Sequence, residues 1–572
     1  MDEPLLTVKN LSVRFKTGKE TSTAVNNVSF DVMPGELVAI VGESGSGKSV
    51  SSLSMMQLLP KQAAVTGEVI FSPNGDSIDL LFLPLKEMMN RRGKDIAMIF
   101  QEPMTSLNPV FTCGDQVMEA IQLHQQVSKK VAAEKVIALF EKVKLPDPSS
   151  ILHRYPHQLS GGQKQRVMIA MAMSCNPSLL IADEPTTALD VTVQKTILEL
   201  IKELQQQNRM SVILITHDLG IVADIADKVI VMYKGSIVEQ GKTAEVLKHP
   251  QHAYTKALLA CRPALHQKGQ RLPVVGEEIE NKKDEIRNEK AEEQQQGKTT
   301  TGDNDRKSTV LSVENLKVYY PGKKSLFGKP AAIFKAVDDV SFTVNKGETL
   351  GLVGESGCGK TTLGRAILQL IPTTAGRILL NGVDIAHLTK KQLQPLRKDL
   401  QVVFQDPYGS LNPRITIGDA ILEPMKVHSV LTGRHTRKEK VIELLEKVNL
   451  RADHFSRYPH QFSGGQRQRV CIARALALNP SFLIFDESVS ALDVSVQAQV
   501  LNLLNDLKAA FNFTSIFISH DLSVVRYISD RIMVMQKGRI IEEGTSEEIY
   551  HAPKNEYTRT LIDAIPGKSL SI

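Results

Sequence analysis

The sequence contains no tryptophan and only five cysteines among its 572 residues. The cysteines show no C-x-x-C spacing, so we expect reduced thiols and neither a zinc site nor an iron–sulfur cluster. They are Cys113, Cys175, Cys261, Cys358 and Cys471. A membrane-spanning helix needs about 18 consecutive apolar residues. The apolar runs here, such as residues 80–85 and 482–485, are far shorter, so we expect that the chain does not cross a bilayer.

A strong excess of one charge is also missing. The chain has 69 Lys and Arg residues against 63 Asp and Glu residues, which leaves a net charge of +6. This near balance gives no electrostatic argument for a nucleic-acid partner. Residues 1–4 lack the basic and apolar stretches of a secretory signal, so we expect a cytoplasmic protein.

Two complete copies of the phosphate-binding pattern G-x-x-x-x-G-K-[ST] are present, at residues 42–49 and 354–361. In this pattern, glycines turn backbone N–H groups toward phosphates, the lysine reaches the outer phosphates and the hydroxyl holds Mg²⁺. The residues concerned are Gly42, Gly45, Gly47, Lys48 and Ser49, and Gly354, Gly357, Gly359, Lys360 and Thr361. Because the pattern occurs twice in a repeated context, we predict two nucleotide sites.

Other motifs repeat in the same order along the chain. F-Q-[DE]-P begins at residues 100 and 404, S-G-G-Q at 160 and 463, D-E at 183 and 486, and H-D at 217 and 520. From the S-G-G-Q motif onward the spacing between copies is constant, which indicates a duplicated domain. We predict a first domain over residues 1–264, a linker over 265–308 and a second domain over 309–572.

The predicted linker is rich in Glu, Lys, Gln, Asn and Thr, and residues 277–307 contain almost no large apolar side chain. Such a segment cannot bury enough surface to offset the entropy lost on ordering, so we predict a disordered tether. Its length would let the two domains face each other. A charged helical arm is the alternative.

Within each copy, short apolar runs alternate with helical patterns, which is typical of a parallel sheet covered by helices. In the first copy we predict buried strands over residues 37–41, 179–182 and 212–215, and a helix that starts at Lys48. These strands end at the phosphate loop, at Asp183 and just before His217. Ligands of open α/β sheets lie at the carboxyl ends of the strands, so all three motifs should meet at one edge.

The order of these motifs resembles the ATP-binding cassette of ABC transporters, and the resemblance covers nearly the whole chain except the linker. It implies an α/β fold with two tandem P-loop NTPase domains, each with a parallel-sheet core and a helical subdomain. Taken alone, a Gly-Gly pair usually forms a turn, a single histidine usually has a structural role, and Phe15 would usually belong to the hydrophobic core. Recurrence of the same residues beside both phosphate loops favours the functional interpretation.

The resemblance also implies a role for each motif residue. Glu184 and Glu487 would orient the attacking water, and His217 and His520 would hold the γ-phosphate, which suits a reaction that depends on positioning and charge. The ligands or sensors of Mg²⁺ would be Ser49, Gln101 and Asp183, and Thr361, Gln405 and Asp486. The other ATP contacts would come from Phe15, Tyr320 and Thr362, and from Ser160, Gly161, Gly162 and Gln163, with Ser463, Gly464, Gly465 and Gln466. In similar cassettes, these last eight signature residues cap the γ-phosphate of ATP held by the opposite domain.

A finer resemblance concerns F-Q-E-P-M-T-S-L-N-P at residue 100, R-Y-P-H-Q at 154 and 457, and Y-T-K-A-L-L at 254. These runs are similar to the ATPases of peptide, nickel and glutathione importers. The resemblance implies two permease subunits, an extracytoplasmic solute-binding protein and a place at the cytoplasmic face of the membrane, with no nucleic acid. Many members carry a cysteine cluster after the cassette, but Cys261 stands alone here, so no cluster is expected.

Two other classes of tandem-cassette ATPase differ from this chain. Those that act on the ribosome typically have a long, basic, helical arm between the cassettes, whereas the linker here mixes both charges. DNA-repair cassette ATPases carry zinc modules, which the cysteine spacing excludes. An importer ATPase is therefore favoured, and the ribosome-associated class is the alternative. Dipeptide, oligopeptide, glutathione and nickel all remain open as the solute.

The two phosphate loops differ at Ser46 and Cys358. A thiol near a helix N-terminus and two residues from Lys360 is expected to have a lowered pKa and to react readily. The alternative is that Cys358 only replaces a small serine.

Overall fold

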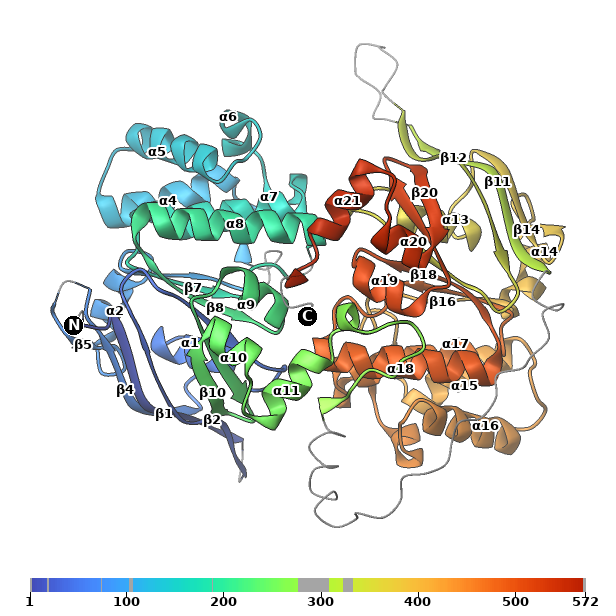
Figure 1. The fold of residues 1–572 in the computed structure, drawn as a ribbon, viewed down its shortest axis with the longest axis horizontal. Helices are drawn as coiled ribbons and strands as arrows, with labels where there is room; N and C mark the ends of the chain where they lie inside the picture. The colour runs from blue at the N-terminus through green and yellow to red at the C-terminus, as the bar shows by residue number, and fades with distance from the viewer. Residues whose placement is uncertain are drawn as a thin grey trace. The chain divides into compact units, whose positions relative to one another are not determined.

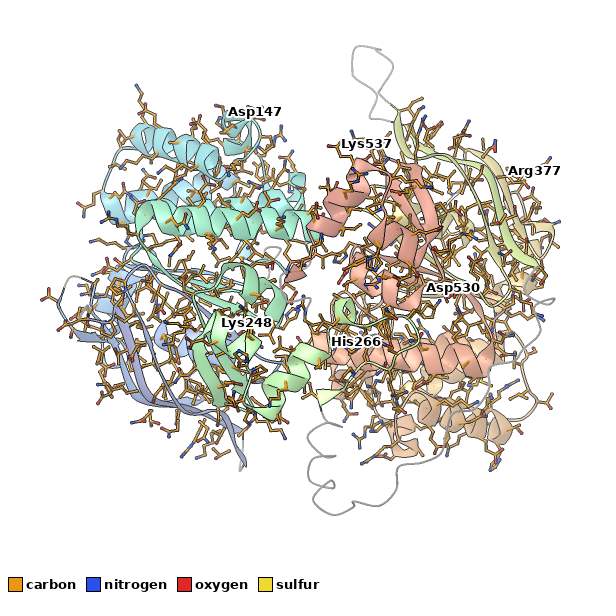
Figure 2. All side chains as sticks on the ribbon, viewed as in Figure 1. Asp147, Lys248, His266, Arg377, Asp530 and Lys537 are labelled. Carbon is orange, nitrogen blue, oxygen red and sulfur yellow. The ribbon has the colours of Figure 1, made fainter. Side chains whose placement is uncertain are left out.

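The computed structural model describes residues 3–17, 20–73, 75–101, 106–187, 189–275, 308–321 and 333–568 (Figure 1). It divides the chain into two units, Met1–Ala260 with Pro566–Ile572, and Cys261–Ile565. Ala188, which follows the first D-E motif, and residues 276–307 of the predicted linker lie outside the described residues. Figure 2 adds the side chains to the same view.

The first unit is built on a six-stranded sheet in the order β10-β9-β3-β8-β7-β6. All neighbouring strands are parallel except β9 and β10. Strands β3, β7 and β8 are buried along their whole length, which explains their unbroken apolar runs. The strands of this sheet are β3 (Leu37–Val41), β6 (Ile96–Ile99), β7 (Leu179–Asp183), β8 (Ser211–Thr216), β9 (Lys228–Tyr233) and β10 (Ser236–Lys242).

A second, antiparallel sheet in the order β2-β1-β4-β5 was not predicted from the sequence. Its strands are β1 (Leu6–Thr17), β2 (Glu20–Val32), β4 (Ala63–Phe71) and β5 (Ile78–Asp79). One apolar cluster is shared by the two sheets, with Leu11 and Val69 from the antiparallel sheet and Ile40 and Ile181 from the parallel one. Register shifts interrupt the β1 ladders between residues 8 and 14. These irregularities weaken the strict alternation by which a strand is recognised in a sequence.

Ten helices of the first unit complete it among the described residues: α1 (Lys48–Met55), α2 (Leu85–Arg91), α4 (Cys113–Gln125), α5 (Lys129–Lys142), α6 (Pro148–Leu152), α7 (Gly161–Ala172), α8 (Val191–Asn208), α9 (Leu219–Ile225), α10 (Thr243–Lys248) and α11 (Ala253–Ala260). Helices α4 to α7 form the predicted helical subdomain, whose core includes Val117, Ile121, Val136 and Phe140. Side-chain oxygens of Thr112, Ser128 and Asp147 cap α4, α5 and α6 and so fix where these helices begin.

The second unit repeats this architecture, with sheets in the orders β12-β11-β14-β15 and β16-β17-β18-β13-β19-β20. Its strands are β11 (Thr309–Tyr320), β12 (Phe334–Asn345), β13 (Thr349–Val353), β14 (Ala375–Leu380), β15 (Val383–Asp384), β16 (Leu400–Val403), β17 (Phe482–Asp486), β18 (Thr514–Ser519), β19 (Arg531–Gln536) and β20 (Arg539–Thr545). Its helices are α13 (Lys360–Ile367), α14 (Lys390–Leu393), α15 (Ile417–Val427), α16 (Arg434–Lys447), α17 (Gly464–Leu476), α18 (Val494–Phe511), α19 (Leu522–Ile528), α20 (Ser546–His551) and α21 (Glu556–Asp563).

The predicted α/β fold with two tandem cassettes is confirmed. The strands predicted over residues 37–41, 179–182 and 212–215 correspond to β3, β7 and β8, which are neighbours in the sheet. Within the described ranges, no helix is both long enough and apolar enough to span a bilayer.

Candidate functional site

Each phosphate loop joins a buried strand to a helix, from β3 to α1 in the first unit and from β13 to α13 in the second. Gly47 precedes α1 with a φ of 100°, and a Cβ there would lie 2.6 Å from the Ala24 carbonyl oxygen. Gly359 has a φ of 114°, and its Cβ would lie 2.2 Å from the Ala336 oxygen. Only glycine combines this left-handed backbone with so close an approach. The loop can therefore curve around an anion at the helix N-terminus.

The loop lysines are buried and hold the loops in shape. Lys48 Nζ donates to the carbonyl oxygens of Gly42 at 2.7 Å and Glu43 at 2.9 Å. Lys360 Nζ donates to the equivalent oxygens of Gly354 at 2.6 Å and Glu355 at 2.9 Å. Since an ammonium has three donor hydrogens, each lysine can retain a carbonyl contact and also bind phosphate oxygens.

A hydroxyl and a carboxylate meet beside each lysine. Ser49 Oγ donates to Asp183 Oδ1 at 3.0 Å, and Thr361 Oγ1 donates to Asp486 Oδ1 at 3.1 Å. Burial raises the pKa of Asp183 to about 6 and also raises the pKa of Asp486. A divalent cation would favour the ionised carboxylates, and these oxygen donors are of the kind that Mg²⁺ prefers. The residues present therefore fit a magnesium ion.

Glu184 lies at the centre of a hydrogen-bonded group at the carboxyl end of β7. Its Oε2 accepts hydrogen bonds from Gln101 Nε2 and from Thr187 Oγ1, both at 2.9 Å. Its Oε1 lies 3.5 Å from His217 Nδ1. Burial alone would raise the pKa of Glu184, but His217, Thr187 and Lys48 together lower it to about 2. Glu184 is therefore ionised at neutral pH and can accept a hydrogen bond from a water molecule.

Glu487 has a similar but not identical environment. Gln405 Nε2 donates to its Oε2 at 2.9 Å, and His520 Nδ1 lies 3.6 Å from the same oxygen. Burial raises the pKa of Glu487, but His520 and Lys360 lower it by more, so its pKa lies below the ordinary value of a glutamate. Ser490 Oγ donates to the Glu487 backbone oxygen, whereas Thr187 in the first unit donates to the carboxylate. The sequence difference after the D-E motif thus changes one contact and retains the glutamate.

Both glutamates have left-handed backbone conformations, with φ of 46° at Glu184 and 49° at Glu487. Such conformations are uncommon for residues other than glycine, and they concentrate at functional sites where the surrounding structure stabilises them. Here the Glu184 N–H donates to Ile215 O at 2.9 Å and the Glu487 N–H to Ile518 O at 3.0 Å. The neighbouring strand therefore fixes the direction of each carboxylate.

The S-G-G-Q motifs begin helices α7 and α17, where Ser160 and Ser463 are the N-cap residues. The Ser160 Oγ accepts from the Gln163 N–H, and the Gln163 side chain accepts from the Ser160 N–H. Ser463 and Gln466 form the same pair. These capping boxes hold the first turn, and the N-terminal N–H groups of such helices can bind an anion.

The residues expected to stack on adenine lie in equivalent antiparallel strands. Phe15, in β1, is partly buried against the apolar cluster between the sheets. Tyr320 is the last residue of β11 and is 42% exposed. Thr362 follows Thr361 in the first turn of α13 and is half-buried. The proposed contacts of these three residues with ATP stay predictions.

A tyrosine that sequence reasoning did not include supports each phosphate loop. The Tyr254 hydroxyl, from α11, accepts a hydrogen bond from the Glu43 N–H at 3.0 Å, and the Tyr557 hydroxyl, from α21, accepts one from Glu355 at 3.0 Å. The Tyr254 ring is fully buried and stacks on Tyr233 with centroids 4.3 Å apart. The repeated Tyr-Thr pair was visible in the sequence, but nothing in the sequence showed that the helix carrying this pair packs against the phosphate loop.

We expect Tyr254→Phe and Tyr557→Phe each to weaken ATP binding at its own site by about 2- to 10-fold, because one neutral hydrogen bond to the loop is lost while the ring is retained. Titration of each variant with a fluorescent ATP analogue, in a chain whose other site carries Lys48→Ala or Lys360→Ala, measures the change. Tyr233→Phe, which removes a hydroxyl that does not contact the loop, is the matched control. Unchanged affinity in both variants would show that the tyrosines do not position the loops.

The expected lowering of the Cys358 pKa is wrong. The Cys358 side chain is buried, and burial raises the pKa of its thiol although Lys360 opposes the shift. Its Sγ lies 3.9 Å from Lys360 Nζ. Loss of solvation outweighs the nearby positive charge, so the interpretation of Cys358 as a small replacement for Ser46 is the better one.

A raised pKa means that less thiolate is present at pH 7 and that its fraction increases only as the pH approaches the raised value. We therefore expect maleimide to label Cys358 more slowly than the half-buried Cys175 at pH 7, with a labelling rate that still increases above pH 9. Single-cysteine variants and mass spectrometry measure both rates. A Cys358 rate that is already constant below pH 8 would contradict the raised pKa.

Comparisons with known proteins identify the family of this chain. The ABC transporter family profile matches residues 25–187 and 337–490, and the profile of the oligopeptide/dipeptide transporter C-terminal region matches residues 238–290 and 541–568. The chain is 49% identical to the glutathione import ATP-binding protein of Escherichia coli O157:H7 over 98% of this chain and 89% of the relative. It is 47% identical to the protein of that name from Pectobacterium atrosepticum, over 99% of this chain and 90% of the relative.

Proposed function

This chain belongs to the ATP-binding proteins of ABC transporters and is an ATPase, and we propose that it powers the import of glutathione or another small peptide through a membrane permease. The observation that carries the proposal is the identity of nearly half the residues to glutathione import proteins along almost the whole chain. The match of both C-terminal regions to the oligopeptide and dipeptide transporter group supports the same solute class. Dipeptides, oligopeptides and nickel are the other solutes to be tested.

The described residues supply each part of ATP hydrolysis. Lys48 binds the outer phosphates, while Ser49 and Asp183 would hold Mg²⁺, which when bound neutralises phosphate charge. Glu184, kept ionised, accepts a hydrogen bond from the attacking water and thereby orients a lone pair of the water toward the γ-phosphorus. Gln101 and His217 hold that carboxylate. Phosphoryl transfer needs this positioning and charge stabilisation more than covalent chemistry.

The second unit supplies the same functions through Lys360, Thr361, Asp486 and Glu487. As in similar cassettes, the signature helices that begin after Ser160 and Ser463 are proposed to bind the γ-phosphate of the ATP held by the opposite cassette. The capped helix N-termini suit an anion. Hydrolysis would then require both cassettes of one chain.

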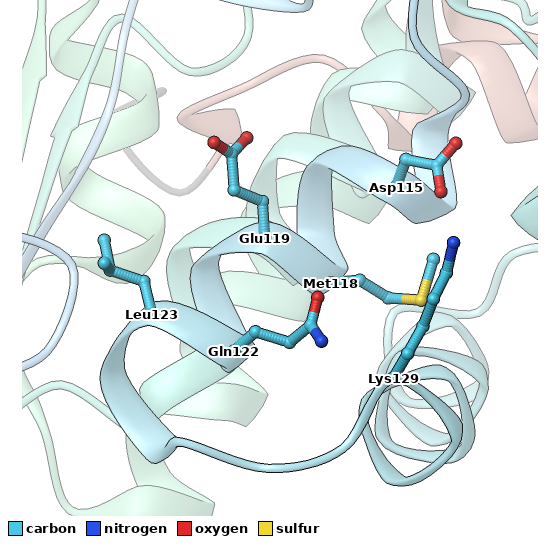
Figure 3. A pocket seen from close by; sticks show the side chains of 6 residues that line it. All are labelled: Asp115, Met118, Glu119, Gln122, Leu123 and Lys129. Atoms are coloured by element: carbon cyan, nitrogen blue, oxygen red, sulfur yellow. The ribbon is translucent and has the colours of Figure 1, made fainter.

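We further propose that the helical subdomains bind the permease subunits at the cytoplasmic face of the membrane. Each subdomain has a hollow between its first two helices, of about 380 Å³ between α4 and α5 and about 490 Å³ between α15 and α16. Figure 3 shows the first hollow, with Leu123 on α4 and Lys129 at the start of α5. Leu123 is 72% exposed, and Val427, at the equivalent place on α15, is 61% exposed. The recurrence of an exposed apolar residue beside the equivalent hollow of both units supports this proposal.

The two hollows differ in charge. The first is lined by two carboxylates, Asp115 and Glu119, and by the single cation Lys129. The second is lined by one carboxylate, Asp419, and by the cations Lys426, Arg434 and Lys438. Opposite charge balance at equivalent surfaces favours two different permease segments, a basic one for the first unit and an acidic one for the second.

The experiment is to purify the tagged chain from cells that also express the permease subunits and to identify what accompanies it. We expect the permease, and we expect Leu123→Asp with Val427→Asp to reduce its recovery at least tenfold while the ATPase activity of the isolated chain is unchanged. Phe82→Asp, at an exposed residue outside the helical subdomain, is the control. Recovery of ribosomes without permease would overturn the importer proposal and favour the alternative.

A further inference from the structure

The chain passes from one unit to the other immediately after helix α11. This helix ends the first unit at Ala260, and Cys261 begins the second. Val275 and Ser308, on either side of residues 276–307, both belong to the second unit. The segment predicted to tether the domains therefore begins and ends on one unit. The residues that follow α11 directly, 261–275, are here called the strap.

The strap lies beside α18 and α19 of the second unit (Figure 1). The Asn502 side chain, on α18, makes two hydrogen bonds with the Leu272 backbone. Its Oδ1 accepts from the Leu272 N–H at 2.9 Å, and its Nδ2 donates to the Leu272 carbonyl at 2.8 Å. Both residues are buried, with exposed fractions of 4% and 1%. An amide that satisfies both backbone groups of one residue recognises extended chain in the way that a neighbouring strand does.

Tyr527, on α19, completes this contact. Its fully buried hydroxyl donates to the Gln270 carbonyl oxygen at 2.7 Å and lies 3.2 Å from Asn502 Oδ1. The side chains of Leu272, Val274 and Val275 are also buried. Buried polar groups must be hydrogen-bonded, so Asn502 and Tyr527 depend on the strap as much as the strap depends on them.

Two ion pairs accompany the buried contacts. Arg271 lies 3.1 Å from Asp506, one helical turn along α18 from Asn502, and Lys268 is paired with Asp530. The Asp530 side chain is labelled in Figure 2. Exposed pairs contribute little to affinity, but their spacing along the strap fixes its direction and register.

The described part of the first unit does not repeat these contacts. In the duplicated sequence, Glu199 and Asp224 occupy the places of Asn502 and Tyr527. A glutamate carboxylate has no hydrogen to donate to a backbone carbonyl, so Glu199 cannot form the double contact. Asp224 Oδ2 instead accepts from the Gly567 N–H at 2.9 Å, from the shorter segment after α21. The two units thus hold different segments through different side chains.

We propose that the strap is a built-in peptide ligand of the second cassette, and that its docking on Asn502 and Tyr527, not the segment 276–307, joins the two cassettes. Unit 1 continues directly into the strap, so the cassettes remain attached while the strap is docked, whether or not ATP is bound. Residues 276–307 can then be cut or shortened without separating the cassettes. This inference does not depend on which solute the protein helps to import.

The test is to insert a protease site between residues 285 and 295 of the full chain, cut it completely and examine the fragments by size-exclusion chromatography without ATP. We expect one species that contains both fragments at micromolar concentration. With Asn502→Ala and Tyr527→Phe together, we expect the dissociation constant of the cut fragments to rise at least tenfold, because buried strap carbonyl and N–H groups lose their partners. Asn502→Ser, a milder variant, should give a smaller rise if Asn502→Ala fails to fold.

Two controls separate the strap from other attachments. Asp224→Ala removes the contact with Gly567 on the first unit and should change the dissociation constant less than twofold. Uncut chain with Asn502→Ala should elute as wild type, which shows that the variant is folded. Separation of the cut wild-type fragments would overturn the proposal, as would a dissociation constant that the Asn502 and Tyr527 variants leave unchanged.

Discussion

Replacing Glu184 and Glu487 together by glutamine is expected to lower the rate of ATP hydrolysis by about 10²- to 10⁴-fold, the range typical for loss of a positioned acid–base group. Both carboxylates are ionised and are fixed by a glutamine and a histidine. Glutamine keeps the shape and one oxygen that can accept from Gln101 or Gln405, but it replaces the other oxygen by an NH₂ group and loses the charge that polarises water. ATP binding should be unchanged, because the phosphate contacts come from the loops.

Steady-state phosphate release and ATP affinity must be measured on the same preparations. Glu141→Gln and Glu446→Gln, at exposed positions in α5 and α16, are matched controls and should hydrolyse ATP at the wild-type rate. Each single variant reports on one site. Near-normal turnover in the double variant would show that neither glutamate has the proposed role.

Lys48→Ala and Lys360→Ala are expected to weaken ATP binding at their own sites by at least about tenfold, since a buried charge-assisted contact contributes about 1.5–3 kcal/mol. The effect should exceed this minimum because each ammonium can contact two phosphates. Lys61→Ala and Lys391→Ala, at exposed positions, should have no effect. Equilibrium binding of an ATP analogue separates the sites, because one site remains intact in each variant.

Full ATP affinity in either lysine variant would contradict the assignment of that loop. The comparison also tests whether the two sites are equivalent. Thr187 donates to the Glu184 carboxylate, whereas Ser490 contacts only the Glu487 backbone. One fewer hydrogen bond to Glu487 should make hydrolysis at the second site the more sensitive of the two to changes at Gln405.

Sequence patterns predicted the parts of the site that depend on short-range chemistry. Strands β3, β7 and β8 contain unbroken apolar runs because they are buried along their whole length, and the polar motifs lie at their carboxyl ends. The phosphate loops need glycine where the backbone is left-handed and closely packed, as at Gly47. Burial of a strand and a left-handed backbone each restrict the residue types at nearby positions, so both can be predicted from a short stretch of sequence.

The features that were missed depend on long-range contacts. Tyr254 reaches the phosphate loop from a helix more than two hundred residues away, and the strap contacts Asn502 across a similar distance. The antiparallel sheet was missed because the irregular register of β1 interrupts its alternation. The pKa of Cys358 was predicted in the wrong direction because charge can be read from neighbouring residues, but burial cannot.

The most direct test of the central claim is solute uptake into proteoliposomes that contain the chain, its two permease subunits and the solute-binding protein. We predict that glutathione or a small peptide accumulates inside only when ATP is hydrolysed, and that the Glu184→Gln, Glu487→Gln double variant binds ATP but supports no uptake. Uptake that proceeds equally well with the double variant, or ATP hydrolysis that none of the candidate solutes affects while ribosomes stimulate it, would contradict an importer ATPase.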